Sequence, residues 1–399
     1  HFAYFKGLIM VTAVMPTYGR IDIAFEYGKG AYLYDTNGEK YLDFATGIAT
    51  NSLGHSHPHL VAAVKEQADK LWHVSNLYNI PQQQRFADRL VENSFADTVF
   101  FCNSGAEAME GCLKVARKYH FENGEPEREE IVCATGAFHG RTLTTLSAGD
   151  SEKYREGFGP RPKGFHHVAF GNLNEMRAAI SNKTAAILVE PIQGEGGINP
   201  ASTAYLQALR DIADEFNTLL IFDEVQCGMG RSGKLFAYEI ANVTPDIMGL
   251  AKGIGGGFPV GAVLATEKAA SGMVPGTHGS TYGGNPLAMA VANAVLDVML
   301  EKGFLASVIK KGTKLKNELV SLVEKHSSVL DSVRGAGLML GIKSVGPNLE
   351  LMTALRESKL LTVVAGENVV RVLPPLNVSE EEILEGIQKI DQTCSQVGS

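Results

Sequence analysis

The sequence predicts an α/β protein with two parts: a large domain, in which helices flank a mostly parallel sheet, and a smaller α+β domain. Between residues 53 and 287, short apolar runs alternate with stretches of helical periodicity, which is the pattern of a parallel sheet covered by helices. After Pro286 the periodicity becomes mainly helical, with two further strand-like runs. The length of 399 residues also exceeds what one hydrophobic core usually fills.

The elements follow in this order. Residues 20–45 alternate polar and apolar side chains around the turn signal at residues 36–38, which predicts a β-hairpin. Six apolar runs then predict strands: VFFC, EIVCAT, HHVAF, AAILVEP, LLIFDEV and VGAVLAT. The runs LMLGIK and VVRVLPP predict strands of the smaller domain. We therefore expect an N-terminal segment (1–52) packing with the small domain, a large domain (53–287) and a C-terminal small domain (288–399).

Composition excludes several classes of protein. With 36 basic and 44 acidic residues the formal charge is −8, which disfavours a nucleic acid as partner. The five cysteines form no CxxC pair, so neither a disulfide framework nor a zinc site is indicated, and a cytoplasmic location is expected. No apolar run is long enough to span a bilayer. The start, HFAYFKGLIMVTAVM, lacks a cleavage signal, and we interpret it as a truncated or artificial end.

Three strand-like runs end in charged residues. Glu190, Asp223 and Lys252 each stand at or just past the end of an apolar run, and ligands of open α/β sheets bind outside the carboxyl ends of the strands. Lys252 could be a solvated loop residue. However, glycines follow it, and they allow a planar ring to approach the backbone of an amine that forms a Schiff base. A buried Asp223 could keep a pyridine nitrogen protonated, so the pair indicates pyridoxal 5'-phosphate.

Two loops could bind the phosphate of such a cofactor. A helix is predicted to start near Ala106, after Ser104 and Gly105, and its free backbone amides would attract an anion, although a serine in this position is more often a simple N-cap. Ser280 and Thr281 lie between glycines just before another helix, where their hydroxyls could bind phosphate or only cap the helix.

Other residues could bind the ring or an anionic substrate. Phe138 could stack on the ring and Arg141 could bind a carboxylate, or they could be a core residue and a surface residue. Arg371 interrupts an apolar strand, which favours a carboxylate partner or an anionic substrate. Glu195 could neutralise such an arginine when no substrate is bound.

Two motifs point to functions that we reject. His55, His57 and His59 alternate as in a metal site, but Pro58 interrupts them and no carboxylate or cysteine stands beside them, so no metal is expected. The segment GIGGGFPVG lacks the spacing of a dinucleotide-binding loop.

Taken together, these segments resemble the class III aminotransferases of the pyridoxal-phosphate fold-type I superfamily, and within them most closely the acetylornithine aminotransferases. The resemblance runs from about residue 18 to 384. It rests on SNLYNIPQQQRFADRLVE, FFCNSGAEA, AFHGRT, VEPIQGEGG, IFDEVQCGMGRSG, LAKGIGGGFPVGA, HGSTYGGNPLA and the hairpin region.

The resemblance implies cofactor roles for residues of the large domain. Gly105 and Ala106 would bind the phosphate through their amides, and Lys252 would hold the cofactor as a Schiff base and carry the proton. Asp223 would pair with the ring nitrogen, and Gln226 would lie near the ring oxygen.

Other implied roles concern the faces of the ring and a second subunit. Phe138 would stack on one face and Val225 would pack on the other. Thr281 would reach the phosphate of the neighbouring subunit, with Ser280 touching substrate, so the implied active unit is a homodimer with shared active sites.

The implied substrate contacts involve both ends of the chain. Arg141 would hold the carboxylate of an acylornithine and Arg371 the α-carboxylate of glutamate or 2-oxoglutarate, with Glu195 as its switchable partner. Tyr18 would line the entrance. Ile48 stands where ornithine aminotransferases usually carry a tyrosine that recognises a free amino group, and an apolar residue suits an acylated amine.

The sequence therefore predicts transfer of the terminal amino group of N2-acetylornithine to 2-oxoglutarate, giving N-acetylglutamate semialdehyde and glutamate, in arginine biosynthesis. Aminotransferases of ornithine, succinylornithine, succinyldiaminopimelate or 4-aminobutyrate remain alternatives, as does a mutase acting on a glutamate derivative. A cofactor-binding homologue without turnover is the alternative from another class. It predicts loss of Lys252 or Asp223, and both are present.

Overall fold

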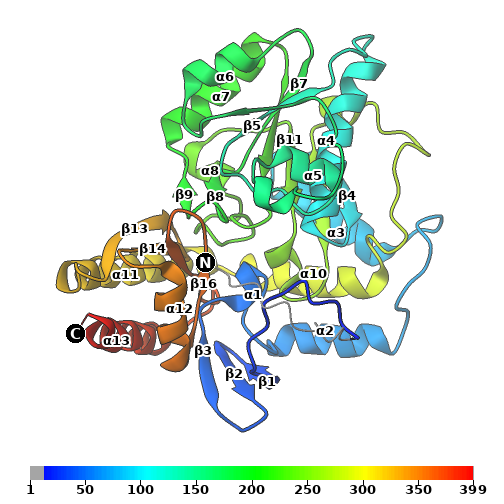
Figure 1. The fold of residues 1–399 in the computed structure, drawn as a ribbon. Coiled ribbons are helices and arrows are strands. Elements are labelled where there is room, and N and C mark those ends of the chain that lie inside the picture. The colour runs from blue at the N-terminus through cyan, green and yellow to red at the C-terminus, as the bar shows by residue number, and fades with distance from the viewer. Residues whose placement is uncertain (1–12, 399) are drawn as a thin grey trace.

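A seven-stranded sheet forms the centre of the large part of the protein (Figure 1). The computed structural model describes residues 13–398. The strand order is β4 (Thr98–Cys102), β12 (Gly261–Ala265), β11 (Ile247–Leu250), β10 (Leu219–Asp223), β7 (Thr184–Val189), β5 (Glu130–Ala134) and β6 (Phe165–Val168). β12 runs antiparallel to both of its neighbours, β4 and β11, and all other neighbouring strands are parallel. The predicted α/β class with a mostly parallel sheet is confirmed, and all six predicted apolar runs form strands of it.

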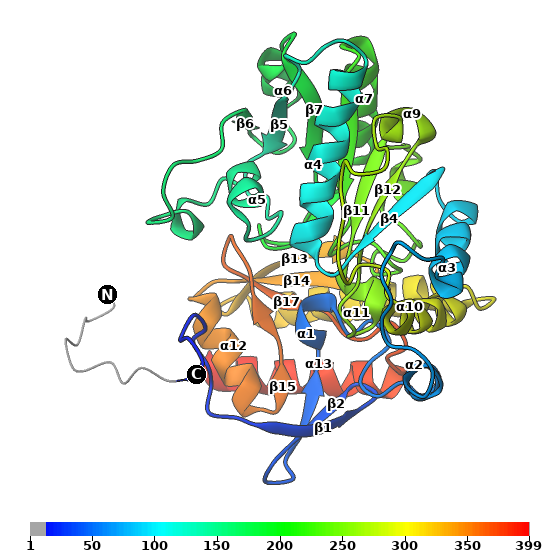
Figure 2. The same cartoon turned by 90° about the vertical axis from the view of Figure 1, so that its right-hand side faces the viewer.

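Helices cover both faces of this sheet because its strands are apolar on both sides. In β10, Leu220 and Phe222 belong to one buried cluster and Ile221 to another, as expected from the alternation of side chains along a strand. The first cluster includes α7 (Thr203–Glu215) and the second α4 (Gly105–Glu122). Figure 2 shows α4 running along the sheet, with α6 (Leu173–Ala179) and α7 beyond it.

The N-terminal hairpin forms a sheet with a strand from near the other end of the chain. β1 (Phe25–Lys29), β2 (Tyr32–Asp35) and β3 (Lys40–Asp43) are antiparallel, with the predicted turn between β2 and β3. β3 then pairs in parallel with β15 (Leu360–Leu361). The short α1 (Thr46–Ala49), α2 (Pro58–Ala68) and α3 (Pro81–Glu92) lead from this hairpin to β4.

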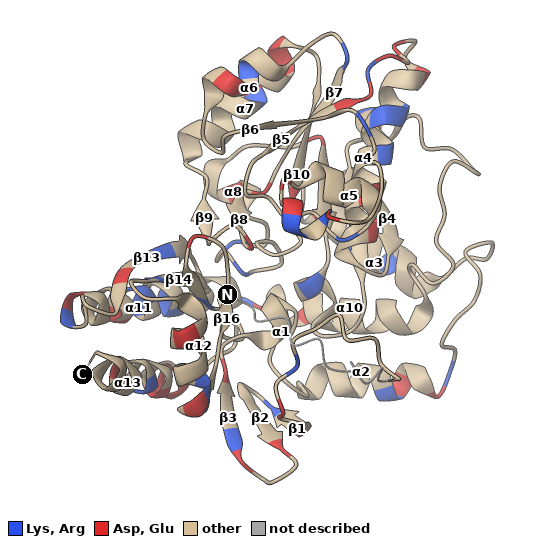
Figure 3. Ribbon diagram, viewed as in Figure 1, with Lys and Arg blue, Asp and Glu red and all other residues tan. Residues whose placement is uncertain are grey.

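The C-terminal part is a second layered unit. Its antiparallel sheet has the order β13 (Leu330–Ala336), β14 (Met339–Ser344), β17 (Val369–Val372) and β16 (Val363–Val364). The helices α11 (Phe304–Lys325), α12 (Asn348–Glu357) and α13 (Glu380–Val397) accompany it, whereas α10 (Pro286–Met299) packs mainly against α2 and α3. Figure 3 shows both signs of charge on α11 and α13, which are joined by ion pairs such as Lys314–Glu380 at 2.7 Å.

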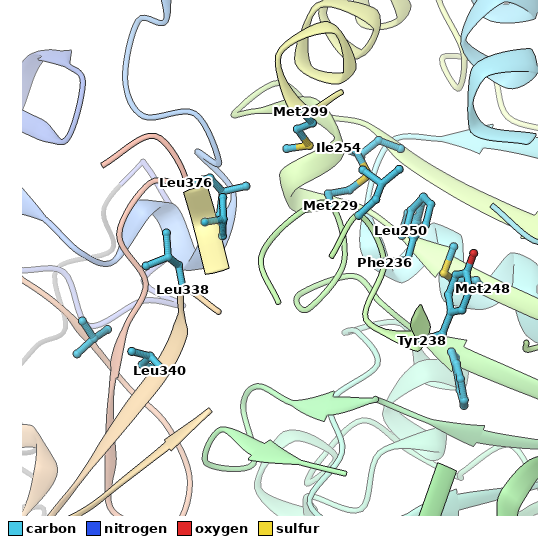
Figure 4. Packing of buried hydrophobic residues seen from close by; sticks show 14 of the residues in the cluster. Met229, Phe236, Tyr238, Met248, Leu250, Ile254, Met299, Leu338, Leu340 and Leu376 are labelled. Atoms are coloured by element: carbon cyan, nitrogen blue, oxygen red, sulfur yellow. The ribbon is translucent and has the colours of Figure 1, made fainter. Parts of the chain in front are cut away.

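The two parts share one hydrophobic core. Met248 and Leu250 of β11 belong to the same buried cluster as Leu338, Leu340 and Leu376 of the C-terminal part. Figure 4 shows these side chains together with the methionines that lie between them in the cluster. The predicted division at residues 52 and 287 stays a prediction, because the core is continuous across both positions.

Short elements complete the fold. They are α5 (Leu143–Ala148), α8 (Tyr238–Ala241), α9 (Glu267–Ala270), the two-residue strands β8 (Ile192–Gln193) and β9 (Asn199–Pro200), and the 3-10 turns η1 (Glu152–Tyr154) and η2 (Lys252–Gly255). Within residues 13–398, no helix is long and apolar enough to cross a membrane. The start of the chain, interpreted above as a truncated or artificial end, lies mostly outside the described residues.

Candidate active site

Three neighbouring strands of the large sheet end at one cavity. Glu190 follows β7, Asp223 ends β10 and Lys252 follows β11, and all three side chains line a hollow of about 390 Å³. The other residues lining it are Thr50, Asn103, Ser104, Gly105, Ala106, Phe138, His139, Gly140, Arg141, Val225, Gln226, Ala251, Gly257, Phe258, Pro259 and Val260. The structure thus brings together nine of the fourteen predicted site residues: Gly105, Ala106, Phe138, Arg141, Asp223, Val225, Gln226 and Lys252 line the cavity, and Arg371 contacts Gln226.

Lys252 opens the turn η2 in a left-handed backbone conformation, with φ of 49°. Such a φ is costly for a residue with a Cβ, and strain of this kind often marks a functional position. Burial lowers the pKa of the Lys252 amine, and the charge of Arg371 lowers it further, against the opposing charges of Asp223 and Glu190. A depressed pKa makes the unprotonated amine, which is the nucleophile and base, more available.

Asp223 is held rigidly at the floor of the site. It is buried, with Oδ2 2.7 Å from His139 Nδ1, while its Oδ1 accepts the backbone amide of Val225 at 3.0 Å. Near it, burial raises the pKa of Glu190 well above the usual range, and the charge of Asp223 adds to this effect. Asp223, fixed by its contacts with His139 and the Val225 amide, is therefore placed to pair with a cationic ring nitrogen.

The amino end of α4 borders the cavity. Ser104 is an N-cap, since its hydroxyl accepts the amide of Glu107 at 3.2 Å, so the capping interpretation holds geometrically. The cap does not occupy the amides of Gly105 and Ala106, which belong to the first turn and line the cavity. A Cβ added to Gly105 would lie 2.8 Å from the Val225 side chain, so this approach requires glycine.

Arg371 lies in β17 and is only 1% exposed. Its Nη2 is 2.8 Å from Oε2 of Glu195, and its Nη1 donates to Gln226 Oε1 at 3.3 Å. Its Nε has no hydrogen-bond partner among the described residues. The predicted pairing with Glu195 is thus present, and this buried cation has a donor left for a ligand.

Arg141 is exposed and stacks on an aromatic ring. Its Cζ lies 3.8 Å from the ring centroid of Tyr154 and 5.5 Å from that of Phe138. No ion pair with a carboxylate is formed by Arg141 within residues 13–398. Its position at the cavity therefore leaves its donors available to a carboxylate.

Six predicted site residues do not line this cavity: Arg371 and Glu195, which pair beside it, and Tyr18, Ile48, Ser280 and Thr281. Tyr18 and Ile48 are exposed by 74% and 37%. Thr281 is also exposed, and Ser280 accepts a hydrogen bond from Asn103 Nδ2 at 3.2 Å. Asn103 does line the cavity, so the 280–281 loop lies behind its wall.

Three residues at or beside the site were not predicted from the sequence: His139, Asn103 and Tyr154. A histidine directly after Phe138 could have drawn attention, but nothing local indicates that it contacts Asp223, 84 positions away. The alternating histidines have separate surroundings: His55 pairs with Asp43 at 2.8 Å, and His59 with Asp297 at 2.9 Å. Among the described residues, no group of three potential metal ligands occurs.

The side chains present fit pyridoxal phosphate. The cavity holds an amine with a depressed pKa, a buried carboxylate for a ring nitrogen, and a helix amino end for a phosphate. Phe138 and Val225 supply the apolar surfaces that a planar ring requires. No feature of the described lining conflicts with this ligand.

Comparisons with known proteins agree with the geometry. Residues 14–394 match the family model described as aminotransferase class-III. The acetylornithine aminotransferase of Mesorhizobium japonicum is 57% identical over 379 residues, covering 95% of each chain. The N-acetylornithine aminotransferase structure from Stenotrophomonas maltophilia is 36% identical, with a TM-score of 0.83 and coverage of 95% and 97%.

A further solved structure bears on the cofactor. The ornithine aminotransferase of Toxoplasma gondii, crystallized with oxidized glutathione, is 32% identical to this chain, with a TM-score of 0.92 and coverage of 96% and 92%. That structure shows partial occupancy of PLP at the active site.

Proposed function

The chain belongs to the class-III aminotransferase family and uses pyridoxal 5'-phosphate, and on this basis we propose that it transfers the terminal amino group of N2-acetylornithine to 2-oxoglutarate. The products are N-acetylglutamate semialdehyde and glutamate, and the pathway is arginine biosynthesis in the cytoplasm. The observation that carries the proposal is the arrangement of two arginines at the cavity. Arg371 is buried and paired with Glu195, whereas Arg141 is exposed and free of carboxylates within residues 13–398.

These two arginines suit substrates with different numbers of carboxylates. Acetylornithine carries one carboxylate, far from its reacting amine, which Arg141 binds while Glu195 stays on Arg371. Glutamate and 2-oxoglutarate carry two, so their α-carboxylate displaces Glu195 from Arg371. Glu195 is 32% exposed by its side chain, which gives it room to move away.

The remaining residues supply proton transfer and orientation. When bound, pyridoxal phosphate accepts the amino group and acts as an electron sink for the carbon that loses its proton. Lys252 Nζ takes this proton from the substrate carbon and would deliver it to C4′ of the cofactor. Burial lowers the pKa of Lys252, which favours the unprotonated amine that acts as the base. Asp223 keeps the ring nitrogen cationic, and the amides of Gly105 and Ala106 bind the phosphate.

Entrance residues determine which amine is accepted. We assign Ile48 and Tyr18 to the entrance, where an apolar Ile48 offers no partner to a free α-ammonium group. Because an unpaired charge at an apolar wall is unfavourable, acetylornithine is preferred over ornithine.

The functional unit in this proposal is a homodimer. Segment 72–78 lies beside the 280–284 loop, since Asn76 Nδ2 donates to the carbonyls of Ser280 and Gly283 at 3.1 and 3.0 Å. This surface exposes Trp72, Leu77, Tyr78 and Tyr282 by 62–89%, which is a large apolar patch to leave in water. A second copy would cover it and receive Thr281 at its phosphate site. Sedimentation velocity would test this, and a monomer at assay concentration would contradict it.

Glutamate formation from 2-oxoglutarate with each amine donor tests the function. We expect kcat/KM for acetylornithine to exceed that for ornithine and 4-aminobutyrate by about 10-fold to 200-fold, the range that one apolar pocket discriminates. Lys252→Ala should abolish turnover, whereas Lys234→Ala, at an exposed position, should not. A higher kcat/KM for ornithine or 4-aminobutyrate than for acetylornithine would contradict the proposed function.

A further inference from the structure

A second hollow adjoins the cavity next to Arg141. It has a volume of about 330 Å³ and lies between the segment 150–154 of the large part and the turn after β16. Its lining, which we call the Tyr154 pocket, consists of Gly136, Ala137, Phe138, Asp150, Ser151, Lys153, Tyr154, Glu195, Val364, Ala365 and Gly366. Phe138 lines both hollows, so the two are adjacent.

Tyr154 connects this pocket to the proposed carboxylate site. The Arg141 guanidinium stacks on the Tyr154 ring, with 3.8 Å between Cζ and the ring centroid. The Tyr154 ring also packs edge-on against Phe138, with the two centroids 6.0 Å apart. Cation–π contacts of this kind fix the direction of an arginine. Tyr154 therefore both lines the pocket and orients Arg141.

The covalent structure of an acylornithine places its acyl group here. The α-carbon carries both the carboxylate and the acylamino group, so the two groups are separated by only a few bonds. If Arg141 binds the carboxylate, the acyl group must lie close to Arg141, and the Tyr154 pocket is adjacent. We propose that this pocket receives the acyl group of the amine donor and that Lys153 favours acyl groups that end in a carboxylate. The inference rests on the proposed function.

The size of the pocket admits more than an acetyl group. At about 30 Å³ for each heavy atom, the volume share of a water molecule, an acetyl group takes about 90 Å³ and a succinyl group about 210 Å³. Both fit within about 330 Å³. Volume alone therefore does not exclude a longer acyl group, and charge becomes the discriminating property.

Lys153, Asp150 and Glu195 are the charged side chains that line the pocket, and neither carboxylate forms an ion pair with Lys153 among the described residues. Glu195 is neutralised by Arg371 at 2.8 Å. Asp150, which also lines the pocket, forms no ion pair within residues 13–398. Lys153 is exposed, lies 5.9 Å from the Tyr154 centroid and forms no ion pair within the described part of the chain.

The experiment compares N-acetylornithine with N-succinylornithine as donors to 2-oxoglutarate, using the holoenzyme. Lys153→Glu should lower kcat/KM for the succinylated donor about tenfold and leave the acetylated donor within about twofold, since reversing an exposed charge removes an attraction and adds a repulsion. Lys163→Glu, at an exposed lysine of the following loop that does not line the pocket, is the matched control. Equal effects of Lys153→Glu on both donors would overturn the role of Lys153.

A second variant tests the location of the acyl group itself. Ser151→Phe fills the pocket, so it should lower kcat/KM for both acylated donors by about tenfold or more and leave the half-reaction with glutamate unchanged, because glutamate has no acyl group. Unchanged rates with both donors would overturn this inference alone. If the unmodified holoenzyme reacts with glutamate but with neither acylated donor, the proposed function fails, and this inference fails with it.

Discussion

His139 and Asp223 form a buried pair at the floor of the cavity. Asp223 is held from two sides, by His139 Nδ1 at 2.7 Å and by the amide of Val225 at 3.0 Å. Nε2 of His139 is buried without a hydrogen-bond partner among the described residues. A buried N–H group without an acceptor is costly, so the geometry favours the tautomer of His139 that carries its proton on Nδ1. This proton is donated to Asp223 and orients its carboxylate.

Replacing His139 by Phe should weaken cofactor retention and turnover together. Loss of a hydrogen bond to a charged group costs about 1.5–3 kcal/mol, which corresponds to about 10-fold to 100-fold in kcat or in cofactor affinity. Absorbance of the bound cofactor after dialysis and the kcat value measure the two effects. His167→Gln is a control, since His167 binds the Ala148 carbonyl outside the cavity. Full cofactor retention in His139→Phe would contradict the orienting role.

Individual residues differed in how well the sequence predicted them. Lys252, Asp223 and Arg371 were detectable from the sequence. A charged residue at the end of an apolar strand, or within one, is rarely buried unless it is paired or functional. Tyr154 was not, because its importance comes from stacking on Arg141 in the folded chain. No local pattern encodes such a contact.

At the scale of elements, the segment around Ile48 departs most from local preference. Thr46, Gly47, Ile48 and Ala49 all have φ between 47° and 62°, so α1 is a left-handed turn. This conformation costs about 1–2 kcal/mol for each residue that has a Cβ. The turn is stabilised by Asp43 Oδ1, which accepts two backbone amides, and by the Thr46 hydroxyl, which donates to a carbonyl at residue 373. A contact across the fold imposes this turn, so the sequence alone could not predict it.

The loop between β10 and α8 contains a second buried carboxylate, which leads to a pH prediction. Glu224 accepts the backbone amides of Ala237 and Tyr238 at 2.6 and 2.7 Å. Burial raises its pKa to about 8, although these amides act in the opposite direction. Between the unfolded and the folded pKa, the folded protein binds one proton more than the unfolded chain, so stability falls as the pH rises.

Glu224→Gln should remove this pH dependence. The stability of the unmodified protein relative to Glu224→Gln should decline by up to about 1.4 kcal/mol for each pH unit between about pH 5 and pH 8. Urea unfolding at several pH values across this range measures it. Parallel curves for the two proteins would show that Glu224 is ionised in the folded state.

At the scale of the whole molecule, local periodicity predicted the layers better than their connections. The strands of the large sheet are encoded by short apolar runs, whereas the pairing of β3 with β15 joins residues 40–43 to 360–361. Such long-range pairing depends on packing of the complete chain. The continuous core shown in Figure 4 has the same origin.

Arg231 joins the two parts of the molecule through this core. It is 2% exposed, and its Nη1 donates to the carbonyls of Leu338, at 3.2 Å, and Pro374. Burial lowers its pKa to about 9, and its Nη2 has no hydrogen-bond partner within residues 13–398. Pro374 stands three positions after Arg371, so this guanidinium links the loop after Asp223 to the end of the strand that carries Arg371.

Arg231→Met should therefore impair binding of dicarboxylates more than binding of the cofactor. The methionine keeps the apolar packing but leaves two buried carbonyls unpaired, at about 1–3 kcal/mol each, and it frees the end of β17 to shift. We expect the KM for 2-oxoglutarate to rise about tenfold, with little change in cofactor absorbance, because the displaced group is Arg371 and not Asp223. Arg177→Met, which removes an exposed partner of Glu215, is the control. A loss of thermal stability with an unchanged KM would show that Arg231 holds the two parts together without positioning Arg371.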